Sequence, residues 1–85
     1  MNPPWQLMVS AKVLAFVESL PRRERAKVVE IFNRLAAHPI LLGSDLGRTD
    51  SRGRTHHLRF VDGYAVLFWF DHAEKVVNVM ETGWQ

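Results

Sequence analysis

The fold of this chain is decided by residues 52–71, which read RGRTHHLRFVDGYAVLFWFD. The pair Asp62-Gly63 separates two runs of apolar, aromatic and β-branched residues, and it tolerates the positive φ angles that a two-residue hairpin turn requires. A third run of this kind, residues 76–81, follows a short polar stretch. The three runs predict three consecutive antiparallel strands.

The N-terminal half predicts a short strand followed by two helices. Residues 5–9 alternate as a strand does, and Ser10 is a suitable N-cap for a helix over residues 11–20. Pro21 ends that helix and suits the first turn of a second one, which His38-Pro39 closes. Each helix has one apolar stripe at helical spacing: Val13, Phe16, Val17 and Leu20 in the first, and Val28, Ile31, Phe32 and Leu35 in the second.

These elements predict a single α+β domain over residues 1–85. Residues 40–51 contain glycine, aspartate and serine, a composition typical of a loop that returns to the sheet. The expected order is a strand, an antiparallel helix hairpin, a loop and a three-strand antiparallel meander, with the helices packed on one face of the sheet.

The period of two along a strand assigns side chains to the two faces of the predicted sheet. We expect one face to contact the helices through His56, Leu58, Phe60, Tyr64, Val66, Phe68 and Phe70. We expect the other, open face to hold His57 and Arg59 beside Ala65, Leu67 and Trp69. Apolar residues beside cations on an open face are typical of a groove that binds a helix or an added strand.

Composition narrows the possible functions. The chain has no cysteine, which excludes disulfides and thiolate zinc sites and suits a reducing compartment. It has no N-terminal signal peptide pattern and no apolar run of about 20 residues, so we expect a soluble, cytoplasmic protein that does not bind membranes. The formal net charge of +2 permits an anionic partner. The spacing of the four histidines predicts no metal site, and we expect no cofactor.

Several local sequences, in this order, resemble the RelE/ParE superfamily of type II toxin–antitoxin toxins. They are Leu35-Ala-Ala-His-Pro39 at the end of the helix hairpin, Leu58-Arg59 followed by Asp62-Gly63-Tyr64, and the closing run Val76-Val-Asn-Val-Met-Glu-Thr-Gly83. The resemblance implies a small cytosolic bacterial protein that is neutralised by a cognate antitoxin. It also implies one of two activities: metal-independent cleavage of messenger RNA in the ribosomal A site, or inhibition of DNA gyrase.

The candidate chemistry lies in the first strand of the meander. Metal-free RNA cleavage needs a base, an acid and fixed cations around the phosphate. We predict His57 as the acid or base, with Arg59 and Arg54 holding phosphate oxygens. Binding of RNA or a partner is predicted for Arg52, Leu67, Trp69 and Trp84, where the tryptophans would stack unpaired bases. Equally, the arginines would serve only as a solvated sheet edge.

Two departures from the family pattern keep a second function open. Ala65 follows Tyr64 where the RNA-cutting members usually have an arginine, and only Trp84 and Gln85 follow Gly83 where a further arginine and an aromatic residue are expected. The main prediction is therefore a ribosome-dependent mRNA endonuclease whose partners are an antitoxin, the ribosome and mRNA. The alternative is a non-enzymatic gyrase inhibitor of ParE type, or a member that retains only antitoxin binding.

Overall fold

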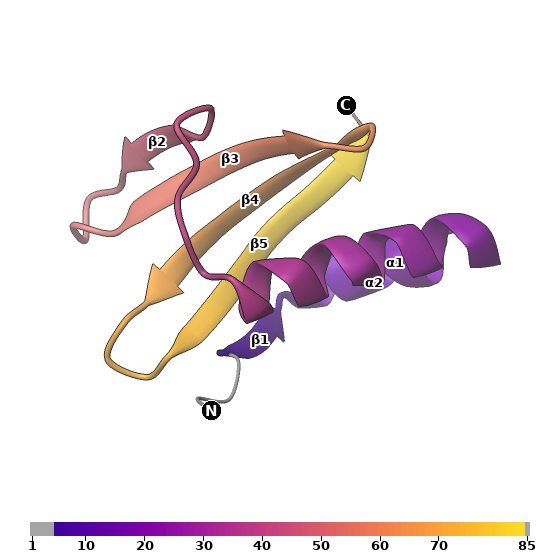
Figure 1. Cartoon of the computed structure of the whole chain (residues 1–85), viewed down its shortest axis with the longest axis horizontal. Coiled ribbons are helices and arrows are strands. Elements are labelled where there is room, and N and C mark those ends of the chain that lie inside the picture. Colours follow the sequence, from indigo (N-terminus) through magenta and orange to yellow (C-terminus); the bar gives the residue numbers. More distant parts are fainter. Residues whose placement is uncertain (1–4, 85) are drawn as a thin grey trace.

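The computed structural model of the chain describes residues 5–84, which form one five-stranded sheet and two helices (Figure 1). The elements are β1 (Gln6–Val9), α1 (Ala11–Glu18), α2 (Arg22–Ala37), β2 (Leu46–Thr49), β3 (Thr55–Val61), β4 (Tyr64–Asp71) and β5 (Val76–Trp84). The strand order is β1-β5-β4-β3-β2, with β1 parallel to β5 and every other pair antiparallel. The α+β class and the predicted order of the elements are confirmed.

Both helices begin within one residue of the predicted position, but α1 ends at Glu18, two residues before the predicted end at Leu20. Ser10 caps α1, because its hydroxyl oxygen accepts a hydrogen bond from the backbone N–H of Val13 at 3.1 Å. Pro21 occupies the N-cap position of α2, which ends at Ala37. The guanidinium of Arg25 donates to the carbonyl oxygens of Glu18 and Leu20, both at 3.2 Å, and so ties α2 to the end of α1.

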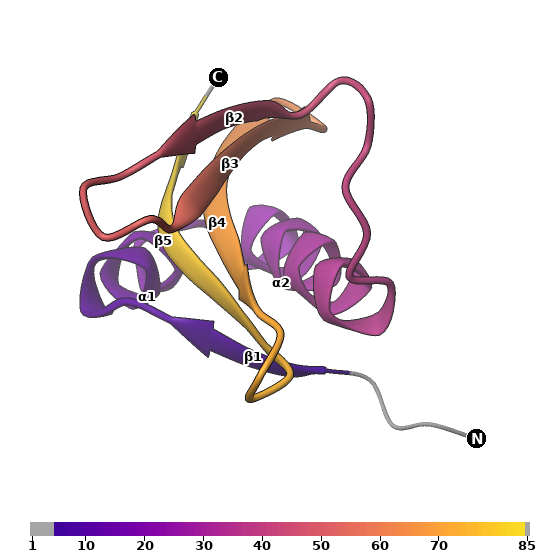
Figure 2. The ribbon, with the colours of Figure 1, turned by 90° about the vertical axis from the view of Figure 1, so that its left-hand side faces the viewer.

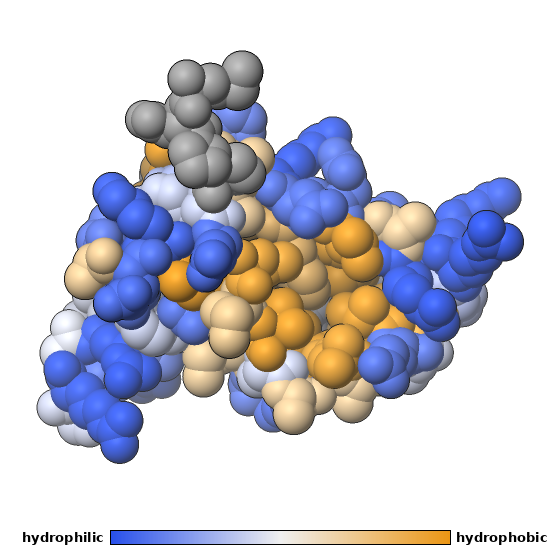
Figure 3. Space-filling view, turned by 90° about the horizontal axis from the view of Figure 1, so that it is seen from below, coloured by the Kyte–Doolittle hydropathy of each residue, from blue (hydrophilic) through white to orange (hydrophobic). Residues whose placement is uncertain are grey.

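A single core lies between the helices and one face of the sheet (Figure 2). The helices contribute Val13, Val28, Ile31, Phe32 and Leu35, and the segment between them contributes Leu20. The strands contribute Tyr64, Val66, Phe68, Val77 and Val79. Tyr64, Val28, Phe68 and Val77 are completely buried. Apolar side chains also gather on the outer surface seen from below in Figure 3, where the helices lie, and Leu14 of α1 and Val29 of α2 are exposed.

Residues 40–51 were predicted to be a loop, but they contain the edge strand β2. Leu46 of β2 lies opposite Leu58, and Thr49 lies opposite Thr55, so β2 and β3 form a second hairpin. Four antiparallel strands therefore replace the predicted three. The sequence Leu46-Gly47-Arg48-Thr49 has no marked apolar alternation, and all four residues are exposed. Pairing with β3, rather than local pattern, makes this segment a strand.

The predicted turn at Asp62-Gly63 is confirmed, but the faces assigned to β3 are wrong. Asp62 and Gly63 have φ angles of 51° and 85°, as a two-residue hairpin turn requires. The turn places Val61 opposite Tyr64, Arg59 opposite Val66 and His57 opposite Phe68. Directly opposed residues project to the same face of a sheet. Because Tyr64, Val66 and Phe68 are buried in the core, His57 and Arg59 face the helix side.

The open face consequently has a different set of residues on β3. His56, Leu58 and Phe60, which were predicted to contact the helices, alternate with His57 and Arg59 and therefore lie on the open face. Leu67 and Trp69 of β4 lie on the open face, as predicted. Leu67 is directly opposite Leu58. Phe60 and Leu46 are 48% and 60% exposed. The open face is thus apolar, with His56 in place of His57.

Candidate functional site

A cavity of about 460 Å³ lies where β3 begins and β4 ends, at the end of the sheet that is on the left in Figure 1. The turns 50–54 and 72–75 both lie at this end of the sheet, and each contributes residues to the cavity. The cavity is lined by Leu41, Gly53, Arg54, Thr55, His57, Trp69, Phe70 and His72. It gathers three of the predicted site residues: Arg54, His57 and Trp69.

Arg54 and Trp69 form a stacked pair at this cavity. The guanidinium carbon of Arg54 lies 4.5 Å from the centre of the Trp69 ring, a cation–π contact that holds the cation over the sheet. The indole Nε1 of Trp69 is shielded from solvent and has no hydrogen-bond partner within residues 5–84. A shielded donor of this kind is uncommon in folded proteins and marks a place where an acceptor from outside the chain would be stabilising.

His57 is a nearly buried histidine on the helix side of the cavity. It is 9% exposed, and its ring centre lies 5.6 Å from that of Phe68 and 6.1 Å from that of Phe70. Burial lowers the pKa of His57 below its ordinary value of about 6.5, assisted by the charges of Arg59 and His56 and opposed by Asp45. The imidazole is therefore neutral near pH 7.

His72 is a second histidine of the cavity, and the sequence did not single it out. It lies in the turn after β4, is exposed, and contacts Trp5 and Phe70 edge to face with ring centres 5.2 Å and 6.1 Å apart. Phe68 and Phe70 lie on the helix side because side chains alternate along a strand. If the same alternation is extended by two residues, it predicts His72 near them. Phe70 thus lies between two imidazoles.

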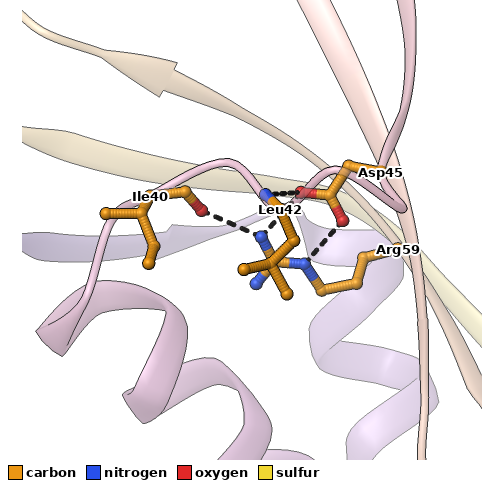
Figure 4. A network of polar contacts seen from close by, with 4 residues as sticks. All are labelled: Ile40, Leu42, Asp45 and Arg59. Atoms are coloured by element: carbon orange, nitrogen blue, oxygen red, sulfur yellow. Dashed lines mark hydrogen bonds and ion pairs between the residues drawn. The ribbon is translucent and has the colours of Figure 1, made fainter.

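Arg59 fastens the segment that follows α2 to the sheet (Figure 4). Its Nε and Nη2 donate to the carboxylate of Asp45 at 2.8 and 2.7 Å, and Nη2 also donates to the carbonyl oxygen of Ile40 at 2.9 Å. The backbone N–H of Leu42 donates to the same carboxylate at 2.9 Å. The hydrogen bonds from Arg59, helped by the Leu42 N–H and opposed by burial, lower the pKa of Asp45. Phosphate binding by Arg59 would have to compete with Asp45.

The fastened segment separates two cavities. Leu41 lines the cavity at the end of the sheet, whereas Ile40 and Leu42 line a second cavity of about 430 Å³ between α2 and β3. The walls of the second cavity are mainly apolar, and the charged side chain of Arg59 also lines it. The pair formed by Arg59 and Asp45 therefore maintains the shape of both cavities.

The remaining predicted site residues lie apart from the cavity. Arg52 is exposed in the β2–β3 turn, where its backbone N–H donates to Asp50 at 2.8 Å. Trp84 lies at the other end of the sheet, opposite Tyr64, with ring centres 4.7 Å apart in a stacked arrangement. Leu67 lies on the open face opposite Glu81. The structure therefore brings Arg54 and Trp69 together and leaves Trp84 outside this site.

Neither helix among residues 5–84 has the length and apolar character needed to cross a membrane. Within the same residues, no group of three or more histidine, aspartate or glutamate side chains is placed to hold a metal ion.

Sequence comparisons leave the chain without a match, whereas its structure has clear neighbours. No protein-family model matches it, and a search of curated proteins finds no match. The RelBE2 toxin–antitoxin complex from Mycobacterium tuberculosis matches with a TM-score of 0.76 and 19% identity, over 100% of this chain and 95% of that chain. The RelE–RelB complex from the archaeon Pyrococcus horikoshii matches with a TM-score of 0.76 and 13% identity, over 96% of each chain.

The isolated RelE toxin of E. coli matches with a TM-score of 0.72 and 16% identity, over 94% of this chain and 83% of that chain. The chain has the RelE fold. The resemblance inferred from the sequence is thus confirmed at the level of the fold. At these identities the comparisons show the RelE fold alone.

Proposed function

We propose that this chain is the toxin of a type II toxin–antitoxin system and that it is an mRNA endonuclease acting on the ribosome without a metal ion. The observation that carries this proposal is the RelE fold over nearly the whole chain, shared with proteins whose structures are those of RelE toxins and toxin–antitoxin complexes. We further propose that it acts in the cytoplasm, on messages that are being translated.

The residues at the end of the sheet supply the groups that such cleavage needs. Arg54, held by Trp69, is a fixed cation for the phosphate, and two histidines, His57 and His72, line the same cavity. The roles in proton transfer and phosphate binding assigned to His57 and Arg59 from the sequence stay predictions. Both side chains face the helix side, where His57 is packed between phenylalanines and Arg59 is paired with Asp45.

We propose a cognate antitoxin as the partner of this chain, because two of the matched structures are RelBE toxin–antitoxin complexes and a third is a RelE–RelB complex. Its docking surface is the open face of the sheet, where Leu46, Phe60, Leu67 and Trp69 present apolar surface. An antitoxin segment that orders on binding would cover this face and block access to Arg54.

One observation favours the alternative of a non-enzymatic gyrase inhibitor. Ala65 lies on the open face opposite Phe60 and Gly83, at the position where the RNA-cutting relatives were expected to have an arginine. The three residues that lie side by side here, Phe60, Ala65 and Gly83, carry no charge. The alternative keeps the antitoxin partner and replaces the ribosome and mRNA with gyrase.

Induction of the chain in a bacterial host, followed by two measurements, tests the proposal. The 5′ ends of cellular messages are mapped, and the supercoiling of a reporter plasmid is followed in the same cultures. We expect growth arrest, new message ends within coding sequences, and unchanged supercoiling. Intact messages with relaxed plasmid would overturn the nuclease proposal in favour of gyrase inhibition.

A further inference from the structure

A histidine and a carboxylate meet on the open face of the sheet, at the end where the candidate cavity lies. His56 Nε2 is 3.1 Å from Asp50 Oδ2, and the side chains are 22% and 33% exposed. The contact has ion-pair distance, but Nε2 has no aligned hydrogen bond within residues 5–84 and is shielded from solvent. Asp50 is thus the nearest acceptor for a nitrogen that water does not reach.

The turn between β2 and β3 fixes the position of this carboxylate. Asp50 Oδ1 accepts hydrogen bonds from the backbone N–H groups of Arg52 at 2.8 Å and Arg54 at 3.0 Å. The N–H of Asp50 donates to the carbonyl oxygen of Arg54 at 2.8 Å, which closes the turn. One carboxylate oxygen is therefore anchored to the backbone, and the other lies 3.1 Å from His56 Nε2.

This arrangement selects one tautomer of the imidazole. A carboxylate beside Nε2 favours the form in which Nε2 carries the hydrogen, and the lone pair then lies on Nδ1. A carboxylate that orients a histidine and stabilises its cationic form is the arrangement by which many enzymes prepare a general base. His57 lacks such a partner, because Asp45 is occupied by Arg59.

Cations surround His56 on the same face. Arg48 of β2 lies directly opposite His56, so the two side chains project to the same side. His57 pairs with Phe68 in antiparallel strands, so the next position along places His56 beside Trp69. The ring of Trp69 in turn contacts the guanidinium of Arg54. His56, Arg48 and the pair of Arg54 and Trp69 therefore occupy neighbouring positions on three adjacent strands.

We infer that His56, oriented by Asp50, is the general base of the RNA cleavage proposed above, with Arg54 and Arg48 as the phosphate-binding cations. The inference rests on the proposed function and moves its catalytic centre from the helix side to the open face. Asp50 and Trp69 are positioning residues, since they act through His56 and Arg54.

The reaction balances with RNA and water alone. His56 Nδ1 takes the proton of a ribose 2′-hydroxyl, the 2′-oxygen forms a bond to the adjacent phosphorus, and the bond from phosphorus to the 5′-oxygen breaks. Water gives a proton to the departing 5′-oxygen, and the resulting hydroxide takes the proton from His56. The products are a 2′,3′-cyclic phosphate and a 5′-hydroxyl, while Arg54 and Arg48 stabilise the charge that gathers on the phosphate.

Cleavage of a message by purified chain in a reconstituted translation reaction tests the inference. The variants are His56→Ala, Asp50→Asn and His57→Ala, with the exposed His38→Gln as control, each checked for thermal unfolding. We expect His56→Ala to lose about 10²–10⁴ of the cleavage rate, Asp50→Asn to lose about tenfold, and His38→Gln to cleave normally. Added imidazole should restore part of the rate to His56→Ala and none to Asp50→Asn, because only the first has lost the ring.

The outcomes separate this inference from the function on which it rests. A wild-type chain that leaves the message intact overturns both. A wild-type chain that cleaves, together with a folded His56→Ala that cleaves as well or is not helped by imidazole, overturns the assignment of the base and leaves the nuclease standing. Loss of cleavage in His57→Ala alone, with the fold retained, would return the base to the helix side. If His56→Ala does not fold, full activity of Asp50→Asn overturns the inference.

Discussion

The carboxylate of Asp45 is held by two nitrogens of Arg59 at 2.8 and 2.7 Å, and its side chain is only 3% exposed. This pair joins β3 to the segment that follows α2, across 14 residues of sequence. Because both partners are shielded from water, loss of either leaves a buried charge without its counterion.

Removal of Arg59 should therefore destabilise the fold more than removal of a surface charge. We expect Arg59→Ala to lower the free energy of unfolding by about 3 kcal/mol, as for other buried pairs that lose one partner. The control is Glu81→Gln, which breaks the exposed ion pair between Lys12 and Glu81, whose side chains are 74% and 55% exposed, respectively. This substitution should lower the free energy of unfolding by at most about 1 kcal/mol. Urea unfolding of both variants decides the matter, and equal losses would mean that Arg59 does not fasten the segment.

The same pair predicts sensitivity to acid. Arg59 lowers the pKa of Asp45 in the folded state below the unfolded value of about 4. The resulting stability is complete above that unfolded value and is lost as the pH falls below it toward the folded pKa. Wild-type protein should lose this contribution as the pH falls below about 4, whereas Asp45→Asn, already less stable at pH 7, should lack it. Parallel unfolding curves at each pH measure the difference, and an identical acid response in both proteins would argue against the pair.

The single tyrosine of the chain gives a direct probe of the core. Tyr64 is completely buried, and its hydroxyl donates to Glu24 at 2.8 Å. Burial, together with the hydrogen bond and charge of Glu24, raises its pKa to about 12. Absorbance titration should show ionisation near pH 12 in folded protein and near about pH 10 in urea.

The contribution of Tyr64 to stability has the corresponding sign. Its pKa is higher in the folded state, so the stability is present below about pH 10 and is lost as the pH rises toward the folded pKa. Glu24→Gln should move the folded transition downward, because it removes the carboxylate charge. Ionisation of folded wild-type protein at the unfolded value would show that Tyr64 is open to solvent.

Binding of an antitoxin should depend on the open face. We expect Trp69→Asp to weaken the complex by about 30-fold or more, the effect of losing a central aromatic contact. Leu14→Asp on α1, where the native side chain is 50% exposed, should bind normally. Calorimetry with a candidate antitoxin would measure both. Normal binding by Trp69→Asp with loss in Leu14→Asp would place the partner on the helix side, where Figure 3 shows apolar surface.

Local signals in the sequence were sufficient for the helices and the central hairpin. Ser10 and the pair Asp62-Gly63 act where they were predicted to act. Pro21 lies at the N-cap of α2, one position before the first helical position that was predicted for it. β2 could not be predicted in this way, because its four residues have no apolar face and become a strand by pairing with β3.

The error in the faces of β3 had a remedy within the sequence. The apolar residues Leu58 and Phe60, considered within β3 alone, indicate the core face of that strand incorrectly. A two-residue turn at Asp62-Gly63 already requires Val61 to oppose Tyr64, which puts His57 with Phe68 and His56 on the other side. The contact between Asp50 and His56 depends on the β2–β3 hairpin and was beyond reach without it.

The account predicts above all that this chain cuts messages that are being translated. The most direct measurement is primer extension on a message added to a reconstituted translation reaction with purified chain, beside the same message with its start codon destroyed. A parallel reaction contains a chelator that binds transition metals but leaves magnesium on the ribosomes. We expect cuts within the coding sequence of the translated message only, unaffected by the chelator. A translated message that stays intact at saturating protein would contradict the account.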